Sequence, residues 1–124
     1  MKILTAIEQT KTNKPSQYSE EMMLKWLSEL DGMVYEEVLE RYGAPKPFLP
    51  YTRSELDEEL AIPFPFDGIY LIWLNAQINS MNCEYERYNN DMMAFNARME
   101  EFQNWYTRKH KVAKPTIIKG ARAL

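Results

Sequence analysis

The sequence predicts an all-α fold: a small helical bundle with a long C-terminal helix, a proline-rich ordered loop and an extended C-terminal tail. Apolar side chains recur at helical spacing through residues 19–43 and 84–109, whereas five of the seven prolines fall within residues 44–66. With 124 residues, of which 45% are hydrophobic and 27% charged, the chain has the size and composition of one globular domain, 1–124.

Residues 84–109 carry the clearest helical pattern. Their aromatic and methionine residues alternate between spacings of three and four, as on one seam of a coiled coil: Tyr85, Tyr88, Met92, Phe95, Met99, Phe102 and Tyr106. A seam of this kind is more often the core of a domain than an assembly surface. We therefore expect most of these side chains to be buried within the subunit.

Residues 19–43 predict a second helix. Ser19 suits the N-cap and is followed by two glutamates, where negative charge favours the helix dipole. Gly43 suits the end of the helix. Gly32 lowers the helix propensity inside it by about 1 kcal/mol relative to alanine, which permits a kink near Asp31.

A third helix is predicted over residues 67–82. Its segment 69–74 is apolar on every side, which is typical of a helix buried on all faces, so we expect it at the centre of the core. Asparagines then predict a bend between Asn79 and Cys83. The proline-rich segment 44–66 contains aromatic residues that it can bury, so an ordered loop is expected rather than a flexible linker.

The two ends of the single helical domain are predicted to be an arm and a tail. Residues 1–14 predict an N-terminal arm with a short helix at 3–10 and without the apolar run of a signal peptide. Residues 111–124 predict a basic tail in which Pro115 precedes a β-prone run at 116–118. The longest apolar run is far shorter than the ~20 residues of a membrane span. Together with a single cysteine, this favours a soluble protein in a reducing compartment.

The residues of common active sites are missing. His110 is the one histidine and Cys83 the one cysteine, so neither a catalytic triad nor a zinc site of the usual His and Cys type has its residues. Adjacent carboxylates such as Glu36 and Glu37 point in different directions on a helix, and the isolated glycines form no phosphate-binding loop. We expect no enzyme, no metal site and no cofactor, and a surface position for His110.

Two features of the last helix indicate a candidate interface. One amide per heptad runs beside the seam, at Asn89, Asn96 and Gln103. These amides either form a polar ladder against a neighbouring subunit or flank the core in water. Met93 and Trp105 lie off the seam and make a second face partly apolar, which is typical of a partner site.

Charge is distributed unevenly along the chain. All 18 acidic residues lie at or before Glu101, and the net charge of −3 argues against binding phosphate backbones over the whole surface. The acidic loop Glu55, Asp57, Glu58 and Glu59 and the basic residues Arg108, Lys109 and Lys111 are candidate complementary faces. The basic tail suits nucleic acid or an acidic protein surface equally well, and its β-prone run suits strand addition to another chain.

The chain resembles a group of small proteins from the structural gene clusters of tailed phages and prophages. Three segments carry the resemblance: KWLSELDGMVYEEV at 25–38, PFDGIYLIWLNAQI at 65–78 and EYERYNNDMMAFNARMEEFQNWYTRKH at 84–110. Residues 1–14 and 111–124 match no part of it.

This resemblance implies a head-to-tail connector, or adaptor, subunit that assembles as a homo-oligomeric ring between the portal and the tail. It implies a virion location after assembly in the bacterial host cytoplasm, with contacts to the portal protein and to neck or tail proteins. DNA would pass transiently through such a ring, and an acidic body suits that passage because it does not hold phosphates. No membrane is involved. The alternative is a small regulatory or DNA-binding helical module that uses the basic C-terminal tail.

Overall fold

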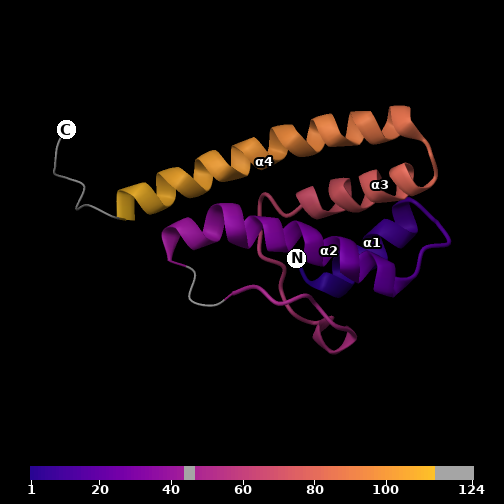
Figure 1. Cartoon of the computed structure of the whole chain (residues 1–124), viewed down its shortest axis with the longest axis horizontal. Coiled ribbons are helices and arrows are strands. Elements are labelled where there is room, and N and C mark those ends of the chain that lie inside the picture. The colour runs from indigo at the N-terminus through magenta and orange to yellow at the C-terminus, as the bar shows by residue number, and fades with distance from the viewer. Residues whose placement is uncertain (44–46, 114–124) are drawn as a thin grey trace.

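The structure is a computed structural model that describes residues 1–43 and 47–113, with side chains up to residue 110. Over these residues the protein is an all-α bundle, as predicted, with helices α1 (Ile3–Asn13), α2 (Glu20–Val34), α3 (Ile69–Met81) and α4 (Tyr85–Ala113). Figure 1 shows α3 and α4 side by side as a hairpin, with α2 and α1 packed below it. Residues 114–124 of the predicted tail lie outside the described residues, and residues 111–113 continue α4 instead of belonging to the tail.

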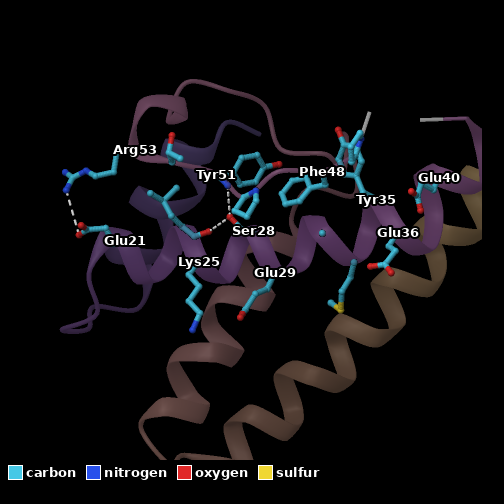
Figure 2. A pocket seen from close by; sticks show the side chains of 16 residues that line it. Glu21, Lys25, Ser28, Glu29, Tyr35, Glu36, Glu40, Phe48, Tyr51 and Arg53 are labelled. Carbon is cyan, nitrogen blue, oxygen red and sulfur yellow. Dashed lines mark hydrogen bonds and ion pairs between the residues drawn. The ribbon is translucent and has the colours of Figure 1, made fainter. Parts of the chain in front are cut away.

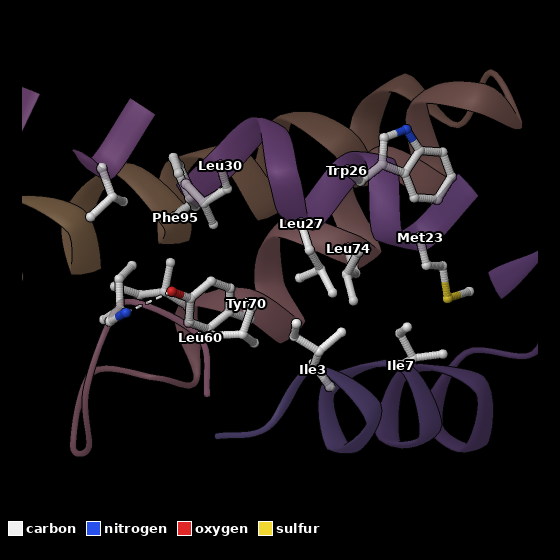
Figure 3. Close-up of a cluster of buried hydrophobic side chains, with 14 of the residues drawn as sticks. Ile3, Ile7, Met23, Trp26, Leu27, Leu30, Leu60, Tyr70, Leu74 and Phe95 are labelled. Carbon is white, nitrogen blue, oxygen red and sulfur yellow. Dashed lines mark hydrogen bonds between the residues drawn. The ribbon is translucent and has the colours of Figure 1, made fainter. Parts of the chain in front are cut away.

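Helix α3 is the centre of the bundle, because it contacts each of the other three helices. Ile69, Tyr70 and Leu74 are completely buried, and the other side chains of the apolar segment 69–74 are half-buried. The central position predicted for this segment is therefore confirmed, whereas its burial on every face is not. Figure 3 shows side chains from all four helices meeting around Leu74 and Tyr70.

Helix α1 corrects the prediction of an N-terminal arm. Ile3, Ala6, Ile7 and Thr10 are buried against α2 and α3, because this spacing places them on one helical face. The loop that precedes α3 is hydrogen-bonded to the first turn of α1. The amides of Ile3 and Leu4 donate hydrogen bonds of 3.0 and 2.9 Å to carbonyls of that loop. Residues 1–14 therefore belong to the bundle.

The predicted helix 19–43 is α-helical only as far as Val34. A π-helical turn, Tyr35–Leu39, and a 3-10 turn, Glu40–Tyr42, follow without a break, and Gly43 ends the segment with a φ of +89°. The change from α-helical geometry therefore begins at Tyr35 rather than near Asp31. Apolar spacing does not distinguish the two geometries here, because Val34 and Val38 are buried along the wider π-helical turn as they would be along an α-helix.

Ser19 caps α2 as predicted, with its Oγ accepting a hydrogen bond of 3.1 Å from the amide of Met22. Replacing Ser19 by alanine is expected to lower the free energy of unfolding by about 1 kcal/mol, because this amide loses its acceptor. Urea unfolding measures the change. Ser19→Asp provides the matched control, since aspartate also caps; an equal loss in both variants would contradict the capping role.

The proline-rich segment is ordered over its described residues 47–66, as predicted. Leu60, Ile62 and Phe66 are buried in the common core, and Phe48 packs against Tyr35 of the π-helical turn with ring centroids 5.2 Å apart. These contacts hold the loop along α2. The loop therefore contributes to the core and closes one side of the bundle.

The predicted bend between Asn79 and Cys83 is the turn that joins α3 to α4. Cys83 adopts a φ of +60°, and the amide of Glu84 donates to the carbonyl of Asn79 at 2.9 Å. The side-chain amide of Asn79 donates to Asp91 at 2.7 Å, which links the two helices beside the turn. The hairpin is therefore fixed by local hydrogen bonds as well as by packing.

The seam of α4 faces the subunit's own core, as expected for most of its members. Phe95 and Phe102 are buried, and Met92, Met99 and Tyr106 pack half-buried against the core. The exception lies at the start of the helix: Tyr85 is 61% exposed. This first turn of α4 lies at the closed end of the hairpin, next to the connection from α3 (Figure 1).

Candidate functional site

A groove of about 900 Å³ runs between the outer face of α2 and the proline-rich loop. We call it the α2 groove. Lys25, Glu29 and Met33 line it from α2, and Phe48 and Arg53 line it from the loop (Figure 2). It is larger than the hollow of about 440 Å³ between α4 and the end of α2, which makes it the first candidate for a binding site.

The floor of the α2 groove is apolar and aromatic. Phe48 stands between Tyr35 and Tyr51, with ring centroids 5.2 Å from each. Met33, which also lines the groove, is 39% exposed. A Cβ added at Gly32 would lie 3.7 Å from the Phe48 ring, so the glycine lets this ring approach α2 closely. Apolar side chains open to water at this place favour a bound apolar group.

Charges line the edge of the α2 groove and are divided between its two ends. At one end, Arg53 pairs with Glu20 at 3.3 Å and with Glu21 at 3.8 Å. Towards the other end, Glu36 and Glu40 extend the lining from the turns that follow α2. That second end is therefore acidic and suits a cationic partner.

One serine is among the residues that line the α2 groove, and hydrogen bonds within the chain occupy its hydroxyl. This serine, Ser28, donates to the carbonyl of Leu24 at 2.8 Å and accepts from the amide of Tyr51 at 2.9 Å, so its hydroxyl is engaged in holding the loop. No histidine or cysteine lines the groove. Among the described residues there is also no group of three side chains able to hold a metal ion.

Sequence reasoning missed the group that positions this loop, the buried carboxylate of Asp31. Its Oδ1 accepts from the Tyr70 hydroxyl at 2.5 Å, and its Oδ2 accepts from the Tyr51 hydroxyl and from the amide of Ala61 at 3.0 Å. The Tyr70 hydroxyl in turn accepts from the amide of Ile62 at 2.6 Å. A signal was available: Asp31 lies four residues after Leu27, on the face that the apolar periodicity predicts to be buried.

Burial determines the ionisation of this cluster. It raises the pKa of Asp31 above its ordinary value, against the hydrogen bonds from Tyr51 and Tyr70, which lower it. Burial and the neighbouring carboxylate likewise raise the pKa values of both tyrosines, so their hydroxyls stay protonated as donors. Asp31 thus ties α2 to α3 and to both arms of the loop.

No protein-family model, curated protein or solved structure matches this chain. None of the described helices is long and apolar enough to cross a membrane.

The predicted interface residues of α4 are spread over two faces. Asn89, Met93 and Asn96 are exposed, whereas Gln103 is half-buried. Asn96 and Gln103 both line a shallow hollow between α4 and the end of α2, beside Met33. Asn96 and Gln103 thus lie at the edge of the contact between α4 and the end of α2, and Met93 is a large exposed apolar side chain of α4.

The predicted basic residues lie near the end of α4, and part of this region is used within the subunit. Trp105 is half-buried against Phe66, with ring centroids 5.3 Å apart, and the ammonium of Lys109 lies 4.8 Å from the Trp105 ring centre. Arg108 is exposed, and the side chain of Lys111 lies outside the described residues. Trp105 therefore packs within the chain, leaving Arg108 and Lys109 as the exposed cations.

The predicted acidic loop lies away from that basic end, on another part of the molecule (Figure 1). Glu55 accepts from the amide of Thr52 at 2.8 Å and closes a capping box, and Glu59 pairs with the N-terminal amine at 3.1 Å. Asp57 and Glu58 are exposed. Because the structure does not bring the two charged faces together, each is open to a different neighbour.

His110 occupies a different environment from the surface position predicted for it. Its ring stacks on Tyr106 with centroids 3.8 Å apart and lies 5.1 Å from the ring of Tyr42. Its Nδ1 lies 3.0 Å from the carbonyl of Tyr106. The half-buried histidine therefore helps to hold the end of α4 against the turn that follows α2.

Proposed function

We propose that this protein is a structural subunit of a tailed-phage head-to-tail connector that assembles as a homo-oligomeric ring between portal and tail. The observation that carries the proposal is the outer face of α4. From Asn89 to Ala97 the exposed positions of this helix bear no charge, and Met93 at their centre is 71% exposed. An exposed methionine among small and amide side chains is typical of a face that a second helix covers.

Two further features support assembly rather than catalysis. The three segments that carry the phage resemblance lie mostly within α2, α3 and α4, three of the helices of the described bundle. The acidic loop and the basic end of α4 lie on different parts of the subunit, as complementary faces of a closed ring require. In this proposal the loop and tail contact the portal protein and the neck or tail proteins, and the protein is located in the virion. DNA passes through a ring whose subunits carry a net charge of −3.

Native mass spectrometry and negative-stain imaging test the proposal on the full chain, alone and mixed with the portal protein of the same phage genome. We expect closed rings, or rings that form on the portal. Monomers that never bind a portal or neck protein would contradict it. Affinity for DNA at low salt that disappears when residues 108–124 are removed would favour the regulatory module instead.

Met93→Asp is expected to weaken ring formation by about tenfold or more, because the interface would have to bury an unpaired carboxylate. Met81→Asp is the matched control, since Met81 is 52% exposed at the far end of α3, away from the uncharged face. Thermal melting of both variants should match the unaltered chain. Equal losses of assembly in the two variants, or none in either, would exclude the outer face of α4 as the contact.

A further inference from the structure

Phe64 stands on the surface on a backbone that is held on both sides. Its side chain is 83% exposed, whereas Ile62 and Phe66 on either side of it are buried in the common core. The carbonyl of Pro65 also accepts a hydrogen bond of 3.0 Å from Arg98 of α4. An exposed aromatic ring on a fixed backbone loses little conformational freedom on binding, which is typical of the anchor residues of protein interfaces.

The charges around Phe64 are mainly positive. The guanidinium of Arg98 lies 5.1 Å from the ring centre of Phe66, and the ammonium of Lys109 lies over the tryptophan ring that packs on Phe66. Glu101 pairs with Arg98 at 2.6 Å, so two cations stand against one carboxylate. We call Phe64, Arg98 and Lys109 the Phe64 face. It combines an exposed aromatic ring with a net positive charge.

The α2 groove has the complementary chemistry. The exposed carboxylates of Glu29, Glu36 and Glu40 follow one another along α2 and the turns after it, beside the aromatic rings of the groove (Figure 2). They stand against one cation, Lys25, because Arg53 is already paired with two glutamates at the start of α2. The groove is therefore aromatic and negatively charged, where the Phe64 face is aromatic and positively charged.

We propose that Phe64 of one copy of this chain inserts into the α2 groove of a second copy. The inserted ring covers the aromatic side chains of the groove, and Arg98 and Lys109 come to lie beside the carboxylates. Aromatic rings favour offset or edge-on contacts with one another. Opposite charges around such a contact speed the encounter and fix its orientation.

A second copy is the occupant because Phe64 of the same chain is fixed elsewhere. Its neighbours in the sequence hold it beside α4, whereas the groove is lined by α2, the turns after it and residues 47–53. The two surfaces are different patches, so each copy that inserts its ring leaves its own groove free for another copy. Repetition of such a head-to-tail contact gives closed rings or open filaments. The inference does not depend on the connector function, since it concerns how two copies touch and not what the assembly does.

Two variants that each remove one side of the contact test it on the full chain. Phe64→Asp removes the ring and keeps the groove, whereas Met33→Asp places a carboxylate in the groove and keeps the ring. We expect the Kd of self-association, measured by sedimentation velocity, to rise about tenfold or more in each variant, because the contact would bury an unpaired charge. Mixed in equal amounts, the two variants should form a heterodimer in native mass spectrometry, since the ring of one and the groove of the other are intact.

Leu49→Asp is the matched control, since Leu49 is 76% exposed on the same loop and is not among the residues that line the groove. It should associate like the unaltered chain. All three variants should keep the melting temperature of the unaltered chain. If Met33→Asp melts lower, Glu29→Lys with Glu36→Lys takes its place, because both of these side chains are exposed.

The outcomes separate this contact from the connector function. A mixture that stays monomeric, an unaltered chain that never associates, or Phe64→Asp that associates like the unaltered chain would overturn the contact. Rings that Phe64→Asp still forms on the portal would overturn the contact and leave the connector proposal standing. Heterodimers from the mixture, together with an unaltered chain that binds no portal or neck protein, would support the contact and contradict the connector proposal.

Discussion

Replacing Phe102 by alanine is expected to lower the free energy of unfolding by about 3 to 5 kcal/mol, because its ring is completely buried. The ring lies between Phe66 of the loop and Tyr106 of α4, with centroid separations of 5.8 and 5.9 Å, so its removal leaves a cavity lined by large side chains that do not collapse easily. Urea unfolding followed by circular dichroism gives the difference directly.

Met93→Ala is the control for this prediction, since it truncates an exposed side chain of the same helix. We expect this substitution to change the free energy of unfolding by no more than about 0.5 kcal/mol. Similar losses in both variants would mean that α4 is stabilised by something other than its seam. A small loss for Phe102→Ala together with failed assembly would identify the seam as an interface between subunits instead of a core.

Asp31→Ala is expected to lower the free energy of unfolding by about 3 to 5 kcal/mol, which is comparable with the effect of removing a core aromatic ring. Two tyrosine hydroxyls and the amide of Ala61 lose their acceptor, and each donor left unsatisfied in a buried site costs about 1 to 3 kcal/mol. Equilibrium unfolding measures the total. Glu29→Ala, an exposed carboxylate of the same helix, is the matched control and should change stability little.

The same carboxylate predicts a pH dependence. Since burial raises the pKa of Asp31 in the folded protein above its ordinary value of 3.8, the native state binds this proton more tightly than the unfolded chain does. The stability contributed by Asp31 is therefore complete below the ordinary value and is lost as the pH rises through the raised one.

The variant Asp31→Asn isolates this contribution, because the asparagine does not titrate. The stability difference between the unaltered chain and Asp31→Asn should be largest in acid and should shrink as the pH rises towards neutrality. Urea unfolding over that range measures it. A difference that grows with pH would mean that the hydrogen bonds from the tyrosines outweigh burial and lower the pKa of Asp31.

Periodicity located the helices within residues 19–43 and 84–109, because a helix that must bury one face repeats apolar residues at a fixed spacing. The cap at Ser19 and the turn before Cys83 were readable from residue types that favour caps and turns. The type of helix was harder to predict than its position. The π-helical turn after Val34 preserves the spacing of buried residues, so the apolar pattern does not reveal it.

The candidate site was predictable only in part. The interface residues of α4 were chosen from the helical pattern, and Met93 is exposed as that pattern requires. The α2 groove was not foreseen, because its two sides come from α2 and from a loop that irregular backbone places beside it. No spacing rule relates Gly32 to Phe48; hydrogen bonds from Tyr51 to Ser28 and Asp31 hold the loop along α2 at this place.

The sequence by itself determined the all-α class, the positions of its main helices and the lack of the usual catalytic residues, since these depend on residue types and on spacing along one helix. Only the tertiary structure decided that residues 1–14 join the core, that Asp31 holds the loop and that a groove opens beside α2. Each of these depends on segments distant in the chain, whose contacts are set by packing and by the need of buried polar groups for partners.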